Sequence, residues 1–212
     1  MRIKFDVNPQ ALRRELLSSM SRRNSSKAFE QNLKGTKGEL LTKKIDELKK
    51  EMVKAFLKHP ITAEILGGPK ATNTSGTLGG YGNLFSFIGF SESDRPIAPI
   101  TKLLEQTSYK MTGMNPRGVL RLTIILPSPA DIFEVTPLPW APGISWAKRM
   151  EVGLSGLGMY LNKDSSLSRS GAGIQSKRQI RTGRFSNASY VSAFMREWRE
   201  RFLKIDKAVK LK

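Results

Sequence analysis

The first chemistry that the sequence suggests is phosphate binding by a glycine-rich loop. Six glycines lie between Gly67 and Gly82 among Thr, Asn and Ser, and a dense apolar run, Leu84–Phe90, follows. A Walker loop needs Lys and then Ser or Thr directly after its last glycine, whereas Gly82 is followed by Asn83. A dinucleotide-binding loop comes after a strand and before a helix, and here that order is reversed. We therefore expect no nucleotide site, but a mobile loop or an arm that becomes ordered on a partner.

The sequence contains few residues that are suited to acid–base, nucleophilic or metal chemistry. The chain has no cysteine and a single histidine, His59, so a catalytic triad would have to use it and any metal site would consist of carboxylates. Asp131 and Glu134 are near enough in sequence to share a Mg²⁺ ion, but no basic residue follows at the spacing that a metal-dependent nuclease needs. The segment Gly153–Leu157 lacks the last glycine of a nucleophile elbow. We expect no enzyme, no cofactor and no bound metal.

His59 itself is expected to have a structural role. It lies in the last turn of a predicted helix, directly before Pro60, where the helix dipole favours a cation. No Ser or acidic residue near it in the sequence completes a catalytic motif.

Positive charge is concentrated at the two ends of the chain. The 212 residues include 36 Lys and Arg against 18 Asp and Glu, which gives a net charge of +18. Residues 163–212 contribute +9 and the first sixty residues +8, so the middle of the chain is nearly neutral. Such a charge favours polyanionic partners, namely nucleic acid, an acidic protein surface or a membrane face. No secretory signal or membrane-spanning run is evident, so we expect a soluble protein without membrane contact.

Helices are expected to dominate the first part of the chain. Arg2–Val7 alternates apolar and polar residues, which predicts a short strand, and Asn8–Pro9 starts a first helix. In Glu39–His59 apolar residues recur at spacings of three and four, which predicts a long amphipathic helix ended by Pro60. The lysines on its outer face form either a solvated surface or an electrostatic docking surface. Ile61–Leu66 is expected to add one more helical turn.

Short strands and turns are expected to follow. The alternation in Leu84–Phe90 predicts a core strand, and that in Gly118–Leu126 predicts the clearest strand of the chain. Between them, the spacing of apolar residues in Pro96–Gln106 predicts a helix, and Tyr109–Arg117 is expected to be a polar connection. Further expected elements are a short helix or turn from Ser128–Asp131, a proline-rich bend at Thr136–Gly143, a helix capped by Ser145 and a loose strand at Leu154–Leu161.

The last quarter combines a basic arm with a helix. Lys163–Asn187 has few large apolar residues and is expected to be a basic arm or an exposed hairpin. Ser189–Lys207 is expected to be a helix with one apolar face that includes Trp198 and Phe202. These two aromatic residues either dock on a partner or pack on the chain's own core.

Together these elements predict a single α+β domain. A small mixed or antiparallel sheet is expected to pack against the long amphipathic helix and the C-terminal helix, with extended Gly-rich and basic arms. We divide residues 1–212 into a helical N-terminal part (1–60), the Gly-rich arm (61–82), a sheet core (83–162), the basic arm (163–188) and the C-terminal helix (189–212). The residues expected to contact partners are Asn73, Thr74, Leu78, Tyr81, Trp140, Arg169, Lys177, Arg178, Arg181, Arg184 and Trp198.

The chain resembles structural proteins of the neck and tail-completion type in tailed bacteriophages. The likeness is carried by three blocks, HPITAEILGGPKATNTSGTLGGYGNLFSFIGF, PLPWAPGISWAKRMEVGLSGLGMYL and SRSGAGIQSKRQIRTGRFSNASYVSAF. It implies a small α+β subunit of the virion, assembled in the host cytoplasm, that forms a neck or tail-terminator ring between head and tail. The expected partners are copies of the chain in a cyclic ring with a six-fold axis, neighbouring neck, portal-adaptor, tail-tube or sheath proteins, and packaged DNA in the channel.

The charge leaves a second function open. A sequence-neutral nucleic-acid-binding protein would use the same basic arm, would bind DNA as an isolated monomer and would lose affinity as salt rises. A third hypothesis, a small hydrolase, has no constellation of residues to support it.

Overall fold

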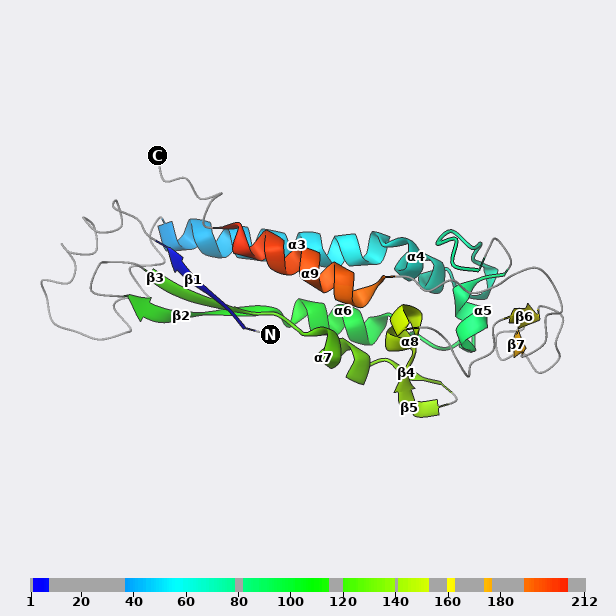
Figure 1. Ribbon diagram of the computed structural model, residues 1–212. Helices are drawn as coiled ribbons and strands as arrows, with labels where there is room; N and C mark the ends of the chain where they lie inside the picture. The colour runs from blue at the N-terminus through cyan, green and yellow to red at the C-terminus, as the bar shows by residue number, and fades with distance from the viewer. Residues whose placement is uncertain are drawn as a thin grey trace, which may run out of the picture. The chain divides into compact units, whose positions relative to one another are not determined.

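The fold is given by a computed structural model of the chain (Figure 1). The described residues are 2–7, 37–78, 82–114, 120–139, 141–152, 160–162, 174–176 and 189–205. Their contacts divide the chain into two compact units, of which unit 1 spans Met1–Met52, Gln106–Leu126 and Glu197–Lys212, and unit 2 spans Val53–Glu105 and Pro127–Arg196. Both units contain helical residues and antiparallel strands, which confirms the α+β class predicted from the sequence.

Unit 1 contains a three-stranded antiparallel sheet in the order β1-β3-β2. The central strand is β3 (Leu120–Ile125), and β1 (Arg2–Val7) pairs with it along its whole length, with Arg2 opposite Ile125. The other edge of β3 pairs with β2 (Ser108–Met114). The sequence predictions of β1 and β3 are confirmed, because the alternation of apolar and polar residues is regular in both segments.

The strand β2 takes the place of the polar connection predicted for Tyr109–Arg117. Its register against β3 shifts between Met111 and Gly113, so the ladder contains a β-bulge there. The bulge interrupts the alternation of side chains, and Ser108 and Lys110 are exposed. The prediction of a connection is wrong for this segment, because an edge strand with a bulge shows no regular apolar face in its sequence.

The long amphipathic helix predicted near the N-terminus is α3 (Lys37–Lys58), which begins in unit 1 and ends in unit 2. Ile45 and Phe56 on its apolar face are each 1% exposed. The helix ends before Pro60, which is the first residue of α4 (Pro60–Leu66). A proline fits at this position because the first amide of a helix has no partner within the helix. The additional turn predicted after Pro60 is therefore confirmed.

The C-terminal helix is α9 (Val191–Leu203), which begins in unit 2 and ends in unit 1. Its apolar face is buried, and Trp198 is only 1% exposed, so of the two alternatives left open by the sequence this face packs on the chain's own core. In unit 2, the ring of Phe194 meets that of Phe56 edge to face, with 5.4 Å between the ring centroids. In unit 1, the guanidinium carbon of Arg201 lies 4.6 Å from the ring centroid of Trp198.

Unit 2 holds the remaining elements. Two-stranded antiparallel sheets join β4 to β5 and β6 to β7. The predicted helices after Pro96, Ser128 and Ser145 are confirmed as α6, α7 and α8, and only the last residues of the strand predicted at Leu154–Leu161 are described. The bounds are η1 (Gly68–Lys70), α5 (Leu84–Ile88), α6 (Ala98–Glu105), α7 (Pro129–Glu134), β4 (Pro137–Leu138), β5 (Ala141–Ser145), α8 (Trp146–Val152), β6 (Tyr160–Asn162) and β7 (Ile174–Ser176).

The core strand predicted for Leu84–Phe90 is wrong, because this segment forms the short helix α5. Asn83 caps its first turn, since the Asn83 side-chain oxygen accepts a hydrogen bond of 2.9 Å from the amide of Ser86. Gly89 ends the helix in the left-handed conformation, with φ of 90°.

The end of α5 is a Schellman motif. The amide of Phe90 donates to the carbonyl of Phe85, and the amide of Gly89 donates to that of Ser86. The rings of Phe85 and Phe90 lie with centroids 5.4 Å apart and form the hydrophobic contact that frequently accompanies this motif. All five residues of α5 are buried, so the alternation in its sequence does not mark one buried and one exposed face and does not indicate a strand.

Among the described residues, no helix combines the length and the apolar composition that crossing a membrane requires.

Candidate functional site

A buried carboxylate, that of Glu64 on α4, organises the first half of the Gly-rich segment. Glu64 is 1% exposed. Its Oε1 accepts hydrogen bonds from the amide of Leu84 at 2.7 Å and from Asn73 Nδ2 at 3.0 Å. Its Oε2 accepts from the amide of Ser75 at 2.9 Å and from Asn73 Nδ2 at 3.2 Å. A buried carboxylate is tolerated only when donors surround it, and here three residues from two segments supply them.

Asn73 and Asn83 extend this network along the loop. The side-chain oxygen of Asn73 accepts from the amide of Leu78 at 3.2 Å, and Asn83 Nδ2 donates to the carbonyl of Pro69 at 2.9 Å. Leu78 is 1% exposed, so its side chain fixes the loop from the apolar side as well. Residues 71–78 are thus held on the chain itself by hydrogen bonds and by burial.

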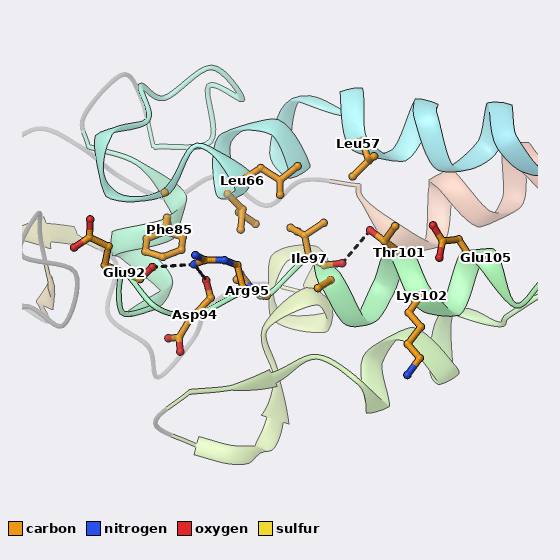
Figure 2. Close-up of a pocket in the computed structure, with 14 residues that line it drawn as sticks. Leu57, Leu66, Phe85, Glu92, Asp94, Arg95, Ile97, Thr101, Lys102 and Glu105 are labelled. Carbon is orange, nitrogen blue, oxygen red and sulfur yellow. Dashed lines mark hydrogen bonds between the residues drawn. The ribbon is translucent and has the colours of Figure 1, made fainter.

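Beside this loop, α3, α4, α5 and α6 surround an apolar groove of about 610 Å³ (Figure 2). We call it the Leu66 groove. Leu57, Leu66, Phe85 and Ile97 supply its apolar surface, and Figure 2 shows Leu57 and Leu66 directed toward Ile97. Leu57 is 36% exposed and Leu66 is 55% exposed, so two large apolar side chains face solvent at one place.

The charged residues of the Leu66 groove are mainly acidic. Glu92, Asp94 and Glu105 line it together with Arg95 and Lys102. Arg95 Nη1 donates to the backbone carbonyls of Glu92 at 3.0 Å and Asp94 at 3.1 Å. Figure 2 shows Lys102 extending away from the side of α6 on which the leucines lie, whereas Glu105 points toward that side. Three acidic and two basic residues thus line the groove, in a chain with a net charge of +18, and Figure 2 shows Glu92 and Glu105 at opposite ends of it.

An aromatic cluster supports the groove-forming helices within unit 2. Tyr190 is fully buried, and its hydroxyl shares a hydrogen bond of 2.8 Å with Thr62 Oγ1 on α4. Its ring lies near those of Phe56, His59 and Trp146, with centroid distances of 6.0, 5.1 and 6.2 Å. Burial raises the pKa of Tyr190 well above its ordinary value, so the hydroxyl stays protonated.

His59 is the connecting residue between α3 and α4. Its Nδ1 is buried and has no hydrogen-bond partner in the described part of the chain. Burial lowers the pKa of His59 below its ordinary value of 6.5. The sequence placed His59 in the last turn of the long helix, and this placement is wrong, because α3 ends at Lys58 and His59 is the N-cap residue of α4.

Glu151 on α8 fixes the start of α9. Its Oε1 accepts a hydrogen bond of 2.6 Å from the amide of Ser192, and its Oε2 accepts one of 2.6 Å from the Ser192 hydroxyl. A carboxylate at the first turn of a helix satisfies an amide that has no partner within the helix and interacts favourably with the helix dipole.

Asp131, one of the two acidic residues considered for Mg²⁺, caps a helix in the structure. Asp131 forms a capping box with Ser128, in which its carboxylate accepts from the Ser128 amide at 2.7 Å. These hydrogen bonds lower the pKa of Asp131 below its ordinary range. In the described ranges no cluster of three or more potential metal ligands occurs.

The residues predicted to contact partners fall into three groups. Asn73 is bound to Glu64, and Thr74 beside it is exposed. Leu78 and Trp198 are each 1% exposed, so their prediction as accessible contact residues is wrong, because both pack in the chain's own core. Tyr81, Trp140, Arg169, Lys177, Arg178, Arg181 and Arg184 lie outside the described residues.

Sequence reasoning missed Glu64 and the Leu66 groove. A signal for Glu64 was present, because a lone acidic residue stands in the apolar segment Ile61–Leu66 and a loop rich in Asn, Ser and Thr follows it. The groove had no such signal, since its residues come from four separate helices and the turn at 92–97.

The fold and the site define a mixed α+β protein with an apolar groove, lined by three acidic and two basic residues, beside a loop organised by a buried carboxylate. Comparison with known proteins finds no matching protein family, no similar curated protein and no similar solved structure.

Proposed function

We propose that the chain is a structural protein of a tailed-phage virion, a ring-forming neck or tail-completion subunit, similar to a tail terminator, that joins head and tail. The observation that carries the proposal is the Leu66 groove, where the exposed side chains of Leu57 and Leu66 line the same surface hollow. Grouped apolar side chains at the surface of a protein are typical of sites that bind another protein. Protein binding, and not catalysis, is what an assembly subunit needs.

The Glu64 network supports this proposal. It fixes residues 71–78 and the amide of Leu84, and thereby the position of α5, whose Phe85 lines the groove. A preformed groove loses little conformational entropy when it binds a partner. In a closed ring each such contact is repeated around the axis, so that interfaces of modest size give a stable assembly.

The resemblance of the three sequence blocks to neck and tail-completion proteins supports the same function. Two of the blocks contain described site residues, namely Glu64 and Phe85 in the first and Trp146 and Glu151 in the second. The third contains residues 168–188 of the basic arm.

A second function, sequence-neutral binding of nucleic acid, is favoured by the charge of +9 on residues 163–212. The two functions predict different behaviour of the purified protein. A ring-forming protein is found as an assembly with a mass several times that of one chain, and short duplex DNA leaves that mass unchanged. A nucleic-acid-binding monomer binds the duplex at low salt and releases it at high salt.

Light scattering of the purified protein at low and high salt, with and without a short DNA duplex, separates the two. A multimer that persists without DNA supports the ring. A monomer that gains the mass of the duplex only at low salt overturns the ring and supports the second function.

A further inference from the structure

The Leu66 groove has features that specify its occupant. Its apolar surface is open, since Leu66 is 55% and Leu57 36% exposed. The carboxylates of Glu92 and Glu105 form no hydrogen bond or ion pair with any residue in the described part of the chain. A segment that fits this groove must bring apolar side chains to the leucines and positive charges to the two carboxylates.

The sequence contains a segment with this composition in the basic arm. Residues 177–187, KRQIRTGRFSN, place Ile180 and Phe185 among four positive charges and include no acidic residue. Phe and Arg are both enriched at protein interfaces, and Arg is also frequent among the residues that contribute most of the binding energy. The segment itself lies outside the described residues, and the strand β7, which directly precedes it, is described.

We propose that the Leu66 groove binds residues 177–187 of a second copy of the chain. Ile180 and Phe185 contact Leu57 and Leu66, and the arginines pair with Glu92 and Glu105. The inference rests on the proposed ring, because a segment that reaches a neighbour's groove repeats head to tail around a cyclic axis.

The first test is binding of a labelled synthetic peptide of residues 177–187. The receptor is the full chain carrying Arg178→Glu, Arg181→Glu and Arg184→Glu, so that its own segment does not compete for the groove. Binding is expected to weaken by about tenfold or more when the receptor also carries Leu66→Glu, and to weaken as salt rises. The matched control is Val152→Glu, because Val152 is 61% exposed and is not part of the groove.

A second test uses two variants that complement each other. The groove variant carries Glu92→Lys and Glu105→Lys, and the segment variant carries the three Arg→Glu changes. Each variant alone is expected to be monomeric. An equimolar mixture is expected to form mixed assemblies, because the intact segment of the groove variant fits the intact groove of the segment variant and the two reversed charge patterns also complement each other. Glu134→Lys serves as the charge control, since Glu134 is exposed on α7 outside the groove.

The outcomes separate this inference from the proposed function. A wild-type ring whose subunits show no peptide binding, or bind equally well with Leu66→Glu, overturns the inference and leaves the ring intact. A wild-type monomer that binds the peptide in a Leu66-dependent way overturns both the ring and the second copy as the source of the segment. Thermal unfolding of every variant identifies a loss of binding that is due to misfolding.

Discussion

The carboxylate of Glu64 accepts a hydrogen bond of 2.7 Å from the backbone amide of Leu84, twenty residues further along the chain. This bond ties α4 to the start of α5 and closes the glycine-rich segment between them. Phe85, the next residue, lines the Leu66 groove. A single buried side chain thus connects the order of the loop to the shape of the proposed binding surface.

Replacement of Glu64 by Gln tests this connection. The amide keeps one acceptor oxygen but places an NH₂ group against the donors of Ser75 or Leu84, which then have no acceptor. We expect the free energy of unfolding to fall by about 1–3 kcal/mol, and by more for Glu64→Ala, because buried donors without partners are costly. Urea denaturation measures the change. Glu134→Gln is the control, and an equal effect of the two variants would contradict the role of Glu64.

Gly89 is expected to resist substitution because it ends α5 with φ of 90°. Gly89→Ala places a Cβ in the left-handed region, which costs about 1–2 kcal/mol. Gly143→Ala is the matched control, since a Cβ at Gly143 meets no atom within 4 Å. Thermal unfolding compares the two. Similar melting temperatures for both variants would show that the Schellman motif does not end this helix.

The helices differ in how well the sequence pattern predicts them. The helix α3 was predictable because its apolar residues repeat at helical spacing over many turns. The helix α5 was not predictable from periodicity, because all of its side chains are buried. Its ends did carry information, since Asn83 at the start and Gly89 followed by Phe90 at the end match the capping residues of a short helix.

The site was less predictable than the fold. Strand β3 and the capping box at Ser128 depend on neighbours in the sequence, so local patterns reveal them. The donors to Glu64 come from residues nine to twenty positions away, and the Leu66 groove combines four helices. For Trp198 the local pattern was visible but ambiguous, because an aromatic residue on a basic helix fits a docking residue and a core residue equally well. Its burial in the structure shows that it is a core residue.

The pH dependence of stability provides a test of the environment of His59. Because burial lowers the pKa of His59 below 6.5, the unfolded chain takes up a proton before the folded chain does as pH falls. The free energy of unfolding therefore decreases from pH 6.5 down to the folded-state pKa, and this contribution is constant above 6.5. His59→Gln is expected to remove this component.

As the only histidine in the chain, His59 gives one set of imidazole ring signals, from its Hε1 and Hδ2 protons, in a proton NMR titration. A midpoint below 6.5 is expected. A midpoint above 6.5 would show that the helix dipole, and not burial beside Tyr190, determines the charge of His59.

The hydrogen bonds of Glu151 to Ser192 are expected to stabilise the first turn of α9. Glu151→Gln weakens two charge-assisted hydrogen bonds at the first turn of the helix, and we expect the free energy of unfolding to fall by about 1–2 kcal/mol. Glu197→Gln on the same helix is the control, because its ion pair with Arg201 is exposed and contributes about 0.5 kcal/mol or less. Equal losses in the two variants would contradict the capping role of Glu151.

Native mass spectrometry of the purified wild-type chain, over a range of protein concentrations and without DNA, tests the central claim most directly. The proposed ring predicts one discrete species at a fixed integer multiple of 23.7 kDa, whose subunit number does not change with concentration. A species at 23.7 kDa alone, or a ladder of multiples that lengthens with concentration, would contradict a closed ring.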